Sequence, residues 1–141
     1  MRTIRVAFTV HVLLLLAGCN TGRSASAPVL ATRSDVYGPG DRIAVTLEND
    51  TSTPIGYNIC YSFLMLERRT DTGWEAVEVS LAPDPTSACT LELKMLAPDE
   101  QAEGVAYLPA ELEAGTYRLA TDVEVESVRE MVATDPFEVR V

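Results

Sequence analysis

The stretch Ile43-Ala44-Val45-Thr46-Leu47-Glu48 decides how this chain is interpreted. Its larger apolar residues occupy every second position, and an alternation with period two predicts a β-strand that buries one face and exposes the other. The polar run Asn49-Asp50-Thr51-Ser52 follows directly and ends the strand, because these residues favour turns. The stretch therefore predicts a strand with one buried face.

The same pattern recurs toward the C-terminus. Asp71-Thr72-Gly73 indicates a hairpin turn, and the proline-containing segment 81–88 indicates a loop. Residues 109–114 fit one helical turn that a glycine ends. The segment 125–133 has valines at helical spacing between flanks that favour a hairpin, and we expect it to be irregular or extended. Further strands are expected at 57–66, 74–79, 90–95 (Leu91, Leu93 and Met95 alternating with polar residues), 105–107, 117–119 and 137–141.

These segments indicate an all-β fold. About seven or eight short strands, with turn residues about every eight to twelve positions, are typical of a β-sandwich. Residues 29–141 are long enough for one domain with a single core. We therefore predict one β-sandwich domain.

Several short motifs occur along residues 36–141. They are Tyr37-Gly38-Pro39-Gly40-Asp41, Leu47-Glu48-Asn49, Asn58-Ile59-Cys60, Gly73-Trp74, Cys89 and Leu112-Glu113-Ala114-Gly115-Thr116-Tyr117-Arg118-Leu119. With these motifs the chain resembles a bacterial immunoglobulin-like domain of the kind found in small secreted proteins and lipoproteins. The resemblance implies an immunoglobulin-like sandwich but is poorly specific for activity. The same layout is more distantly similar to the intracellular proteinase inhibitor family of Bacillus.

The N-terminus has the layout of a secretory signal. Arg2 and Arg5 precede an apolar run that is too short to span a bilayer. The run ends in Leu16-Ala17-Gly18-Cys19, which resembles the lipobox of bacterial lipoproteins. The resemblance implies that residues 1–18 are removed and that Cys19 carries diacylglyceryl and N-acyl chains of the palmitate type. An ordinary signal peptide that happens to contain a cysteine is the alternative.

If the lipobox is used, the mature protein is anchored in the cell envelope. More than one acyl chain is needed for stable attachment, and the lipoprotein resemblance supplies them. Residues 19–28 are small and polar and form the expected tether between the membrane and the domain at 29–141. Asn20 follows the cysteine, where retention at the inner membrane usually requires aspartate. We therefore expect the periplasmic face of the outer membrane in a Gram-negative cell.

The charge of the chain excludes some partners. The whole chain carries 11 basic and 21 acidic side chains, and loss of Arg2 and Arg5 with the signal leaves 9 against 21. Such an acidic surface repels nucleic acid phosphates and anionic lipid head groups. We expect no nucleic acid partner. The membrane is reached only through the lipid anchor, and we expect another envelope protein, not a small-molecule substrate, as the partner.

Two cysteines remain once Cys19 is acylated. Cys60 and Cys89 are then an even pair in an oxidising compartment, where a disulfide is the default expectation. Two buried free thiols are the alternative. The spacing fits neither a CxxC redox motif nor a zinc site.

The residue types that most enzymes use are missing from the mature chain. The single histidine, His11, lies in the signal, so no imidazole remains for a Ser-His or Cys-His nucleophile or for a metal. Lys94 is the only lysine, which weakens a Ser-Lys mechanism. We therefore expect no enzyme, no cofactor and no metal site.

Two groups of side chains are candidates for a site. Trp74, Tyr57 and Tyr61 are candidates for an aromatic patch that contacts a partner, with ordinary packing as the alternative. Asp122, Glu124 and Glu126 lie on one face of an extended segment, as a calcium site or a glycosidase pair would require. A solvated face with the neighbouring valines turned inward explains these acids more simply.

Three functions follow from these observations. The first is a lipid-anchored, non-catalytic module that binds or scaffolds another envelope protein. The second is a proteinase inhibitor that offers the loop at 81–88, which ends at Cys89. The third is an enzyme that works with carboxylates alone, for which the sequence indicates no substrate.

Overall fold

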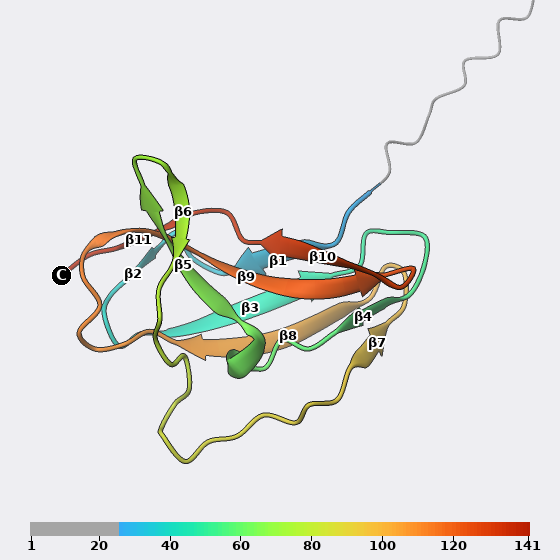
Figure 1. Cartoon of the computed structure of the whole chain (residues 1–141), viewed down its shortest axis with the longest axis horizontal. Coiled ribbons are helices and arrows are strands. Elements are labelled where there is room, and N and C mark those ends of the chain that lie inside the picture. Colours follow the sequence, from blue (N-terminus) through green and yellow to red (C-terminus); the bar gives the residue numbers. More distant parts are fainter. Residues whose placement is uncertain (1–25) are drawn as a thin grey trace, which may run out of the picture.

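The computed structural model describes residues 26–141 (Figure 1). The proposed signal at 1–18, Cys19 and most of the tether lie outside the described residues. Within 26–141 the chain forms short strands and one 3-10 helix, η1. In chain order these elements are β1 (Val29–Thr32), β2 (Val36–Tyr37), β3 (Arg42–Glu48), β4 (Ile55–Tyr57), η1 (Tyr61–Phe63), β5 (Met65–Thr70), β6 (Gly73–Ala76), β7 (Lys94–Leu96), β8 (Gln101–Tyr107), β9 (Gly115–Val125), β10 (Val128–Ala133) and β11 (Phe137–Val139).

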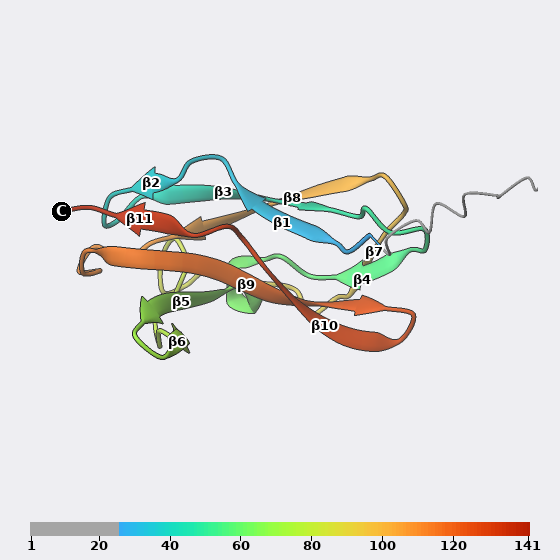
Figure 2. The same cartoon turned by 90° about the horizontal axis from the view of Figure 1, so that it is seen from above.

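Two sheets pack face to face, as Figure 2 shows from above. The first sheet has the order β1-β3-β8, and the second has eight strands around the long strand β9. One edge of β9 pairs with β11 and then β10, while its other edge pairs with β5 and then β4. Strand β6 extends the sheet beyond β5, and β7 extends it beyond β4. The predicted all-β sandwich is confirmed, with eleven strands in place of seven or eight, several of which have only two or three residues.

The core lies between the two sheets. Ile43, Val45 and Leu47 are buried on β3, so the alternation that defined the first strand is confirmed. The second sheet contributes the inward residues of β9, β4 and β11. Burial of a side chain of this size stabilises the folded state by about 1.5–3 kcal/mol. The core contains Leu30, Ile43, Val45, Leu47, Ile55, Ile59, Leu64, Leu66, Leu81, Leu96, Ala106, Leu108, Leu112, Tyr117, Leu119, Val123, Phe137 and Val139.

Tyr117 joins the start of β9 to the loop before it. Its ring is buried and stacks on Phe137 at 6.4 Å between centroids, and its hydroxyl donates to the carbonyl oxygen of Glu113 at 2.8 Å. A tyrosine that bonds back to the backbone just upstream is the tyrosine corner of immunoglobulin-like sandwiches. At 109–114, where one helical turn was predicted, the chain forms an isolated four-residue turn without helix, in which the Leu112 amide donates to the Pro109 carbonyl at 3.2 Å.

Two hairpins extend from the eight-stranded sheet. Asp71 and Thr72 connect β5 to β6, which confirms the predicted turn. The segment 125–133 is extended, as expected, and pairs with β9 as β10. Its two-residue turn consists of Glu126 and Ser127, with φ angles of 49° and 67°. Positive φ at both central positions is the type I′ geometry that suits a twisted hairpin and usually selects Asn-Gly.

The predicted strand at 57–66 is interrupted. Strand β4 ends at Tyr57, and η1 separates it from β5. The chain leaves the sheet because the carbonyl oxygen of Ile59 packs on β8 at Gly104, where a Cβ would lie only 2.5 Å from that oxygen. The alternating aromatic residues therefore do not share one long strand. They lie on β4, on η1 and around the half-buried connection at residues 58–60, which we call the crossing.

The predicted strand at 90–95 has the opposite register from the one expected. Only Lys94–Leu96 is a strand, and Ile55 pairs with Leu96, which is buried. Because side chains alternate between faces, Met95 and Leu93 must then point away from the core. Leu91, Leu93 and Met95 are accordingly 89%, 51% and 63% exposed. The strand at 74–79 is likewise shorter than predicted and ends at Ala76.

Within residues 26–141, no helix has the length and apolar character needed to cross a bilayer.

Candidate binding surface

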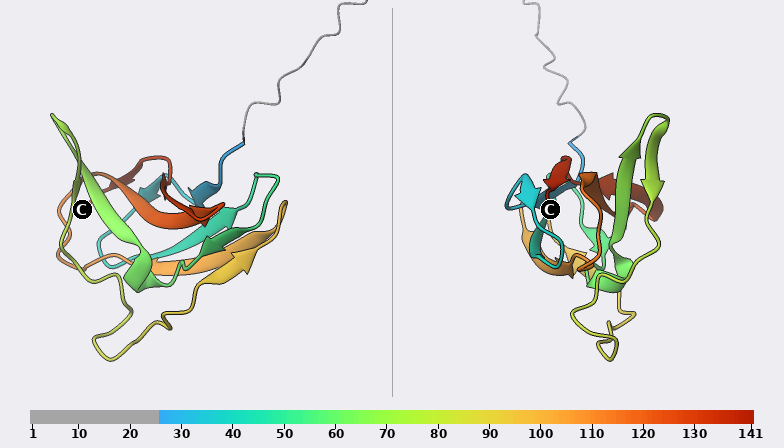
Figure 3. Two further views of the ribbon diagram at one scale, coloured as in Figure 1. Left: turned by 45° about the vertical axis from the view of Figure 1, so that its right-hand side comes forward. Right: turned by 90° about the vertical axis from the view of Figure 1, so that its left-hand side faces the viewer.

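The eight-stranded sheet has one face in the core and one in solvent, which we call the outer face. On β9, Leu119, Thr121 and Val123 are buried against the first sheet, whereas Asp122 and Glu124 are exposed on the opposite side. Cross-strand partners share a face, so the partners of the outward β9 residues also lie on the outer face. The β5–β6 and β9–β10 hairpins extend from this sheet at opposite ends of the molecule (Figures 1 and 3).

Trp74 of β6 lies at one end of the outer face. The guanidinium carbon of Arg118 is 4.5 Å from the centroid of the Trp74 ring, and that of Arg69 is 5.4 Å away. Arg118 also donates from Nε to Glu67 Oε2 at 2.5 Å, and the side chains of this ion pair are only 20% and 13% exposed. The two guanidinium groups, one of them in a half-buried ion pair, therefore hold the Trp74 indole in place.

Methionines occupy the middle of the same face. Met65 pairs with Ala120, and Met131 pairs with Asp122, on opposite edges of β9. They are 40% and 53% exposed, whereas Ala120 between them is buried. Unbranched thioether side chains adapt to partners of different shape. Met65, Met131 and Trp74 thus give the outer face an apolar surface that the core does not use.

The acidic residues on β9 form a solvated face. Asp122 and Glu124 point outward while Val123 is buried, as the simpler interpretation predicted. Glu126 lies in the hairpin turn and not in the strand, so the three carboxylates do not continue one regular row. Within 26–141, no three metal-ligating side chains are grouped closely enough to hold an ion. Arg129, the cross-strand partner of Glu124, balances part of this charge.

The three aromatic residues singled out in the sequence are not brought together. Trp74 lies on the outer face, whereas Tyr57 and Tyr61 pack against the core. Both tyrosines line a cavity of about 540 Å³ that opens between β8 and the disulfide-linked segment. The hydroxyl of Tyr61 is buried there without a hydrogen-bond partner among the described residues. Ordinary packing therefore describes these two tyrosines.

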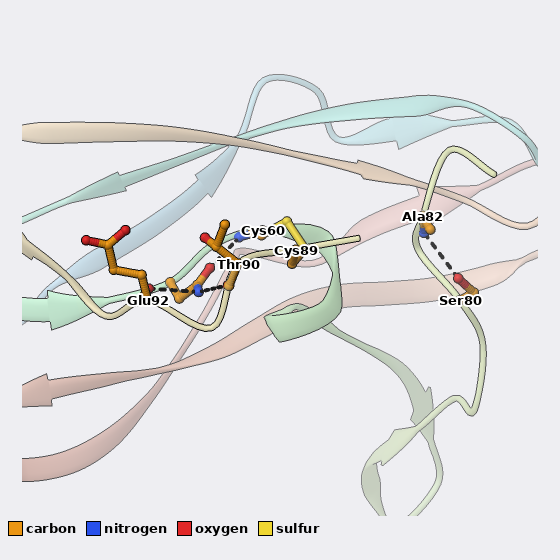
Figure 4. Close-up of a disulfide and its surroundings, with 7 residues drawn as sticks. Cys60, Ser80, Ala82, Cys89, Thr90 and Glu92 are labelled. Atoms are coloured by element: carbon orange, nitrogen blue, oxygen red, sulfur yellow. Dashed lines mark hydrogen bonds between the residues drawn. A yellow bond between two sulfur atoms is a disulfide. The ribbon is translucent and has the colours of Figure 1, made fainter. Parts of the chain in front are cut away.

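Cys60 and Cys89 form the predicted disulfide, which Figure 4 shows in place. Their Cα atoms are 5.9 Å apart, within the range that disulfides require. The bond joins the crossing before η1 to the connection between β6 and β7. It does not link the two sheets, as the disulfide of antibody domains does.

The long β6–β7 connection is held at several points. Leu81 is buried and its carbonyl accepts from the amide of Tyr107 at 3.0 Å. Between Leu81 and Cys89, the carboxylate of Asp84 accepts from the Thr86 amide at 2.9 Å and from the Ser87 hydroxyl at 2.7 Å. These hydrogen bonds lower the pKa of Asp84, with the bond from the Thr86 side chain as the largest cause. The predicted loop at 81–88 is confirmed and is locally ordered.

Arg68 and Tyr117 are the other groups with shifted pKa values. The hydrogen bond to the Glu113 carboxylate raises the pKa of Arg68, which keeps this exposed side chain charged. Burial raises the pKa of the Tyr117 hydroxyl, so that it stays a protonated donor to the backbone. Both shifts raise the pKa of groups that are already protonated at neutral pH, so neither creates an acid or a base suited to catalysis there.

Sequence reasoning missed Met65, Met131 and Arg118 as surface residues. Met65 lies between the buried residues Leu64 and Leu66, and this alternation is the sequence signal that could have identified Met65 as a surface residue. Arg118 is flanked in the same way by Tyr117 and Leu119. Neither pattern identifies which strands are neighbours, so the cluster around Trp74 was not predictable from it.

Comparison with known proteins supports the fold. Residues 24–138 match the family model described as a bacterial Ig-like domain, and such domains are generally non-catalytic modules. Among solved structures, the sporulation control protein Spo0M from Bacillus subtilis is similar, with 15% sequence identity and a TM-score of 0.49. The alignment covers 84% of this chain and 50% of that one, so the chain spans about half the length of Spo0M. No curated protein matches the sequence.

Proposed function

The chain belongs to the bacterial Ig-like domain family, and on that premise we propose that it is a lipid-anchored, non-catalytic envelope protein that binds another envelope protein. The part of the outer face that carries Trp74, Met65 and Met131 is the proposed contact surface. The observation that carries the proposal is the half-buried cluster of Trp74, Arg118 and Glu67 beside exposed Met65 and Met131.

The composition of this surface supports a protein partner. Trp, Arg and Met are the residue types enriched at protein interfaces. Trp74 is held by Arg69 and Arg118, so binding does not require the ordering of a free indole. An aromatic anchor that is ordered in advance reduces the entropy lost on association.

The N-terminal sequence supports the anchor. Leu16-Ala17-Gly18-Cys19 supplies the acylation motif. The pairing of Cys60 with Cys89 suits an oxidising compartment, where disulfides persist. The described chain begins, just before β1, at the end of the molecule opposite the β5–β6 hairpin (Figure 1). A lipid-attached domain would thus present Trp74 at the end away from its attachment.

In-cell photocrosslinking tests the proposal. A photoreactive amino acid is placed at Met65 or Met131, and at Val141 as an exposed apolar control that follows the last strand, β11. We expect a discrete adduct with another envelope protein from 65 and 131 and none from 141, and loss of that adduct in Trp74→Ala. Equal labelling from all three positions, or none, would contradict the assignment. Fractionation of Cys19→Ser tests the anchor separately, with unprocessed or released protein as the expected result.

A second function, proteinase inhibition, is favoured by the loop 81–88. Buried Leu81 and the Cys89 disulfide hold its ends, and Asp84 orders its exposed middle. Inhibitory loops benefit from such rigidity because less conformational entropy is lost on binding. A panel of bacterial serine proteases incubated with the protein would show tight inhibition with slow cleavage. Rapid cleavage within the loop, or no effect, would exclude this function.

A further inference from the structure

Strand β7 is an edge of the eight-stranded sheet. Only β4 pairs with it among residues 26–141. The segment before it continues the same line, because the side-chain amide of Asn58 donates to the carbonyl oxygens of Thr90 and Glu92 at 2.9 and 3.0 Å. Residues 90–96 therefore run as one extended segment along the sheet, although only the last three form a regular strand.

The free edge of this segment carries unpaired backbone groups. In a strand, the backbone polar groups of successive residues point to opposite edges. Because Thr90 and Glu92 direct their carbonyls toward Asn58, the amides and carbonyls of Leu91, Leu93 and Met95 point to the open edge. An extended edge of this kind is a template for pairing with another strand.

The side chains along this edge are apolar on one face. Leu91, Leu93 and Met95 are all more than half exposed. Leu93 also lies across Gly56 of β4, since a Cβ at Gly56 would be 2.8 Å from its Cδ2 atom. The apolar row is therefore fixed on the outer face and is not a frayed end.

The sequence of the segment is self-complementary. In an antiparallel pairing centred on Leu93, Glu92 of each copy faces Lys94 of the other. Leu91 faces Met95 of the second copy, and Leu93 faces its own equivalent. Residues 91, 93 and 95, whose backbone groups point to the open edge, then form the hydrogen-bonded pairs. Residues 92 and 94 form the non-hydrogen-bonded pairs, which lie closer together and whose side chains interact most directly.

We propose that β7 pairs antiparallel with β7 of a second copy, to give a two-fold dimer whose eight-stranded sheets join into one. The dimer contact is a surface separate from the one around Trp74, and it does not depend on the proposed function or on the lipid anchor. Lysine on an edge strand usually prevents pairing. Here the two-fold arrangement places Glu92 of the second copy opposite Lys94. A different strand without an acidic residue at that place would leave the Lys94 charge unpaired. We therefore take a second copy of this chain as the strand that pairs with β7.

Sedimentation equilibrium of the mature chain with Cys19→Ser tests the proposal. We expect a reversible monomer–dimer equilibrium. Glu92→Lys places two lysines opposite Lys94 residues, and Lys94→Glu places glutamates opposite Glu92. Each variant should weaken dimerisation about tenfold or more, because two attractive pairs become repulsive. Arg33→Glu, also exposed but away from β7, should leave the equilibrium unchanged as a control for net charge.

Mixing the two variants makes the test specific. Glu92→Lys and Lys94→Glu are each self-repelling but complement one another, so the mixture should form a heterodimer, and the double variant should recover the homodimer. Leu93→Cys should oxidise to a disulfide-linked dimer, because paired Cα atoms about 5.5 Å apart lie within disulfide reach, whereas Leu91→Cys alone should not. A protein that stays monomeric at every concentration, or variants that fail to restore one another, would overturn the proposal. Loss of photocrosslinked adducts at the outer face with an intact dimer would instead remove only the proposed function.

Discussion

The guanidinium group of Arg118 lies between the Trp74 ring and the Glu67 carboxylate, 4.5 Å from the ring centroid. This places one side chain of the longest strand in contact with two residues of the β5–β6 hairpin. Among residues 26–141 no strand pairs with the far edge of β6, so Arg118 links this outermost strand directly to β9. Several consequences can be measured.

Arg118→Ala should destabilise the fold more than Arg69→Ala. Both arginines contact the Trp74 ring, but only Arg118 also pairs with the half-buried Glu67 carboxylate. We expect a loss of about 1–2 kcal/mol for Arg118→Ala and under about 1 kcal/mol for Arg69→Ala. Urea unfolding measures both. Equal losses would show that the Glu67 contact contributes nothing, and a Glu67→Gln double-mutant cycle would confirm that result.

Tyr117→Phe should cost about 1–1.5 kcal/mol of unfolding free energy, because it removes only the hydroxyl that donates to the Glu113 carbonyl. Tyr37→Phe is the matched control. Its hydroxyl accepts from the exposed Ser34 amide at 3.0 Å, which water can replace, so the loss should be below about 0.5 kcal/mol. Thermal unfolding of the two variants distinguishes loss of the Tyr117–Glu113 hydrogen bond from a general effect of removing a tyrosine hydroxyl.

Removal of the Cys60–Cys89 disulfide should destabilise the protein by about 3–4 kcal/mol, since the bond closes a separation of 29 residues in the unfolded chain. The Cys60→Ser, Cys89→Ser double variant provides the measurement by denaturant unfolding. Added reductant should lower the stability of the parent protein and leave that of the double variant unchanged. An equal response of both would mean that the disulfide does not carry the effect.

Asp84 should titrate below the usual range for aspartate. The hydrogen bonds from Thr86 and Ser87 favour its charged form, so its folded-state pKa is lower than its unfolded-state pKa. The stability that this provides is present above the unfolded pKa and is lost as the pH falls through the lowered folded pKa. Carboxyl NMR titration measures the shift. Thr86→Val should move the pKa of Asp84 upward, whereas Ser80→Ala, outside the turn, should not.

Ser127→Gly should stabilise the β9–β10 hairpin. Ser127 has a φ of 67°, a conformation that costs a non-glycine residue about 1 kcal/mol, whereas glycine adopts it freely. We expect a gain of about 0.5–1 kcal/mol in unfolding free energy. Ser62→Gly, in η1 at a position without positive φ, should be destabilising instead. A loss at both positions would mean that the turn is not strained at Ser127.

Much of the fold could be predicted from local patterns. The alternation of Ile43, Val45 and Leu47 defined β3, because the period of two directly reports which side chains share a face. The hairpin at Asp71 and Thr72 followed from turn chemistry, and the pairing of Cys60 with Cys89 followed from their number. These features depend on residues close in sequence or on a single available partner.

The failed predictions share one cause, which is that the pairing between strands cannot be read from a single segment. The alternation of Leu91, Leu93 and Met95 with polar residues does not show which side chains face the core, and only the pairing of Leu96 with Ile55 decides this. Tyr57 and Tyr61 were candidates for one patch with Trp74, yet Tyr57 pairs with inward-facing Val123 and Tyr61 follows the crossing at Ile59, so both pack against the core.

The amino-acid sequence by itself determined the strand alternation, the turns, the acidic charge, the absence of histidine from residues 19–141 and the self-complementary order of Glu92 and Lys94. Only the tertiary structure decided that Trp74 meets Arg118, that Met65 and Met131 share the outer face and that β7 is an edge. Each of these requires knowing which strands are neighbours. Strand order depends on contacts between residues distant in sequence, whose free energy exists only after both sheets have packed around the common core.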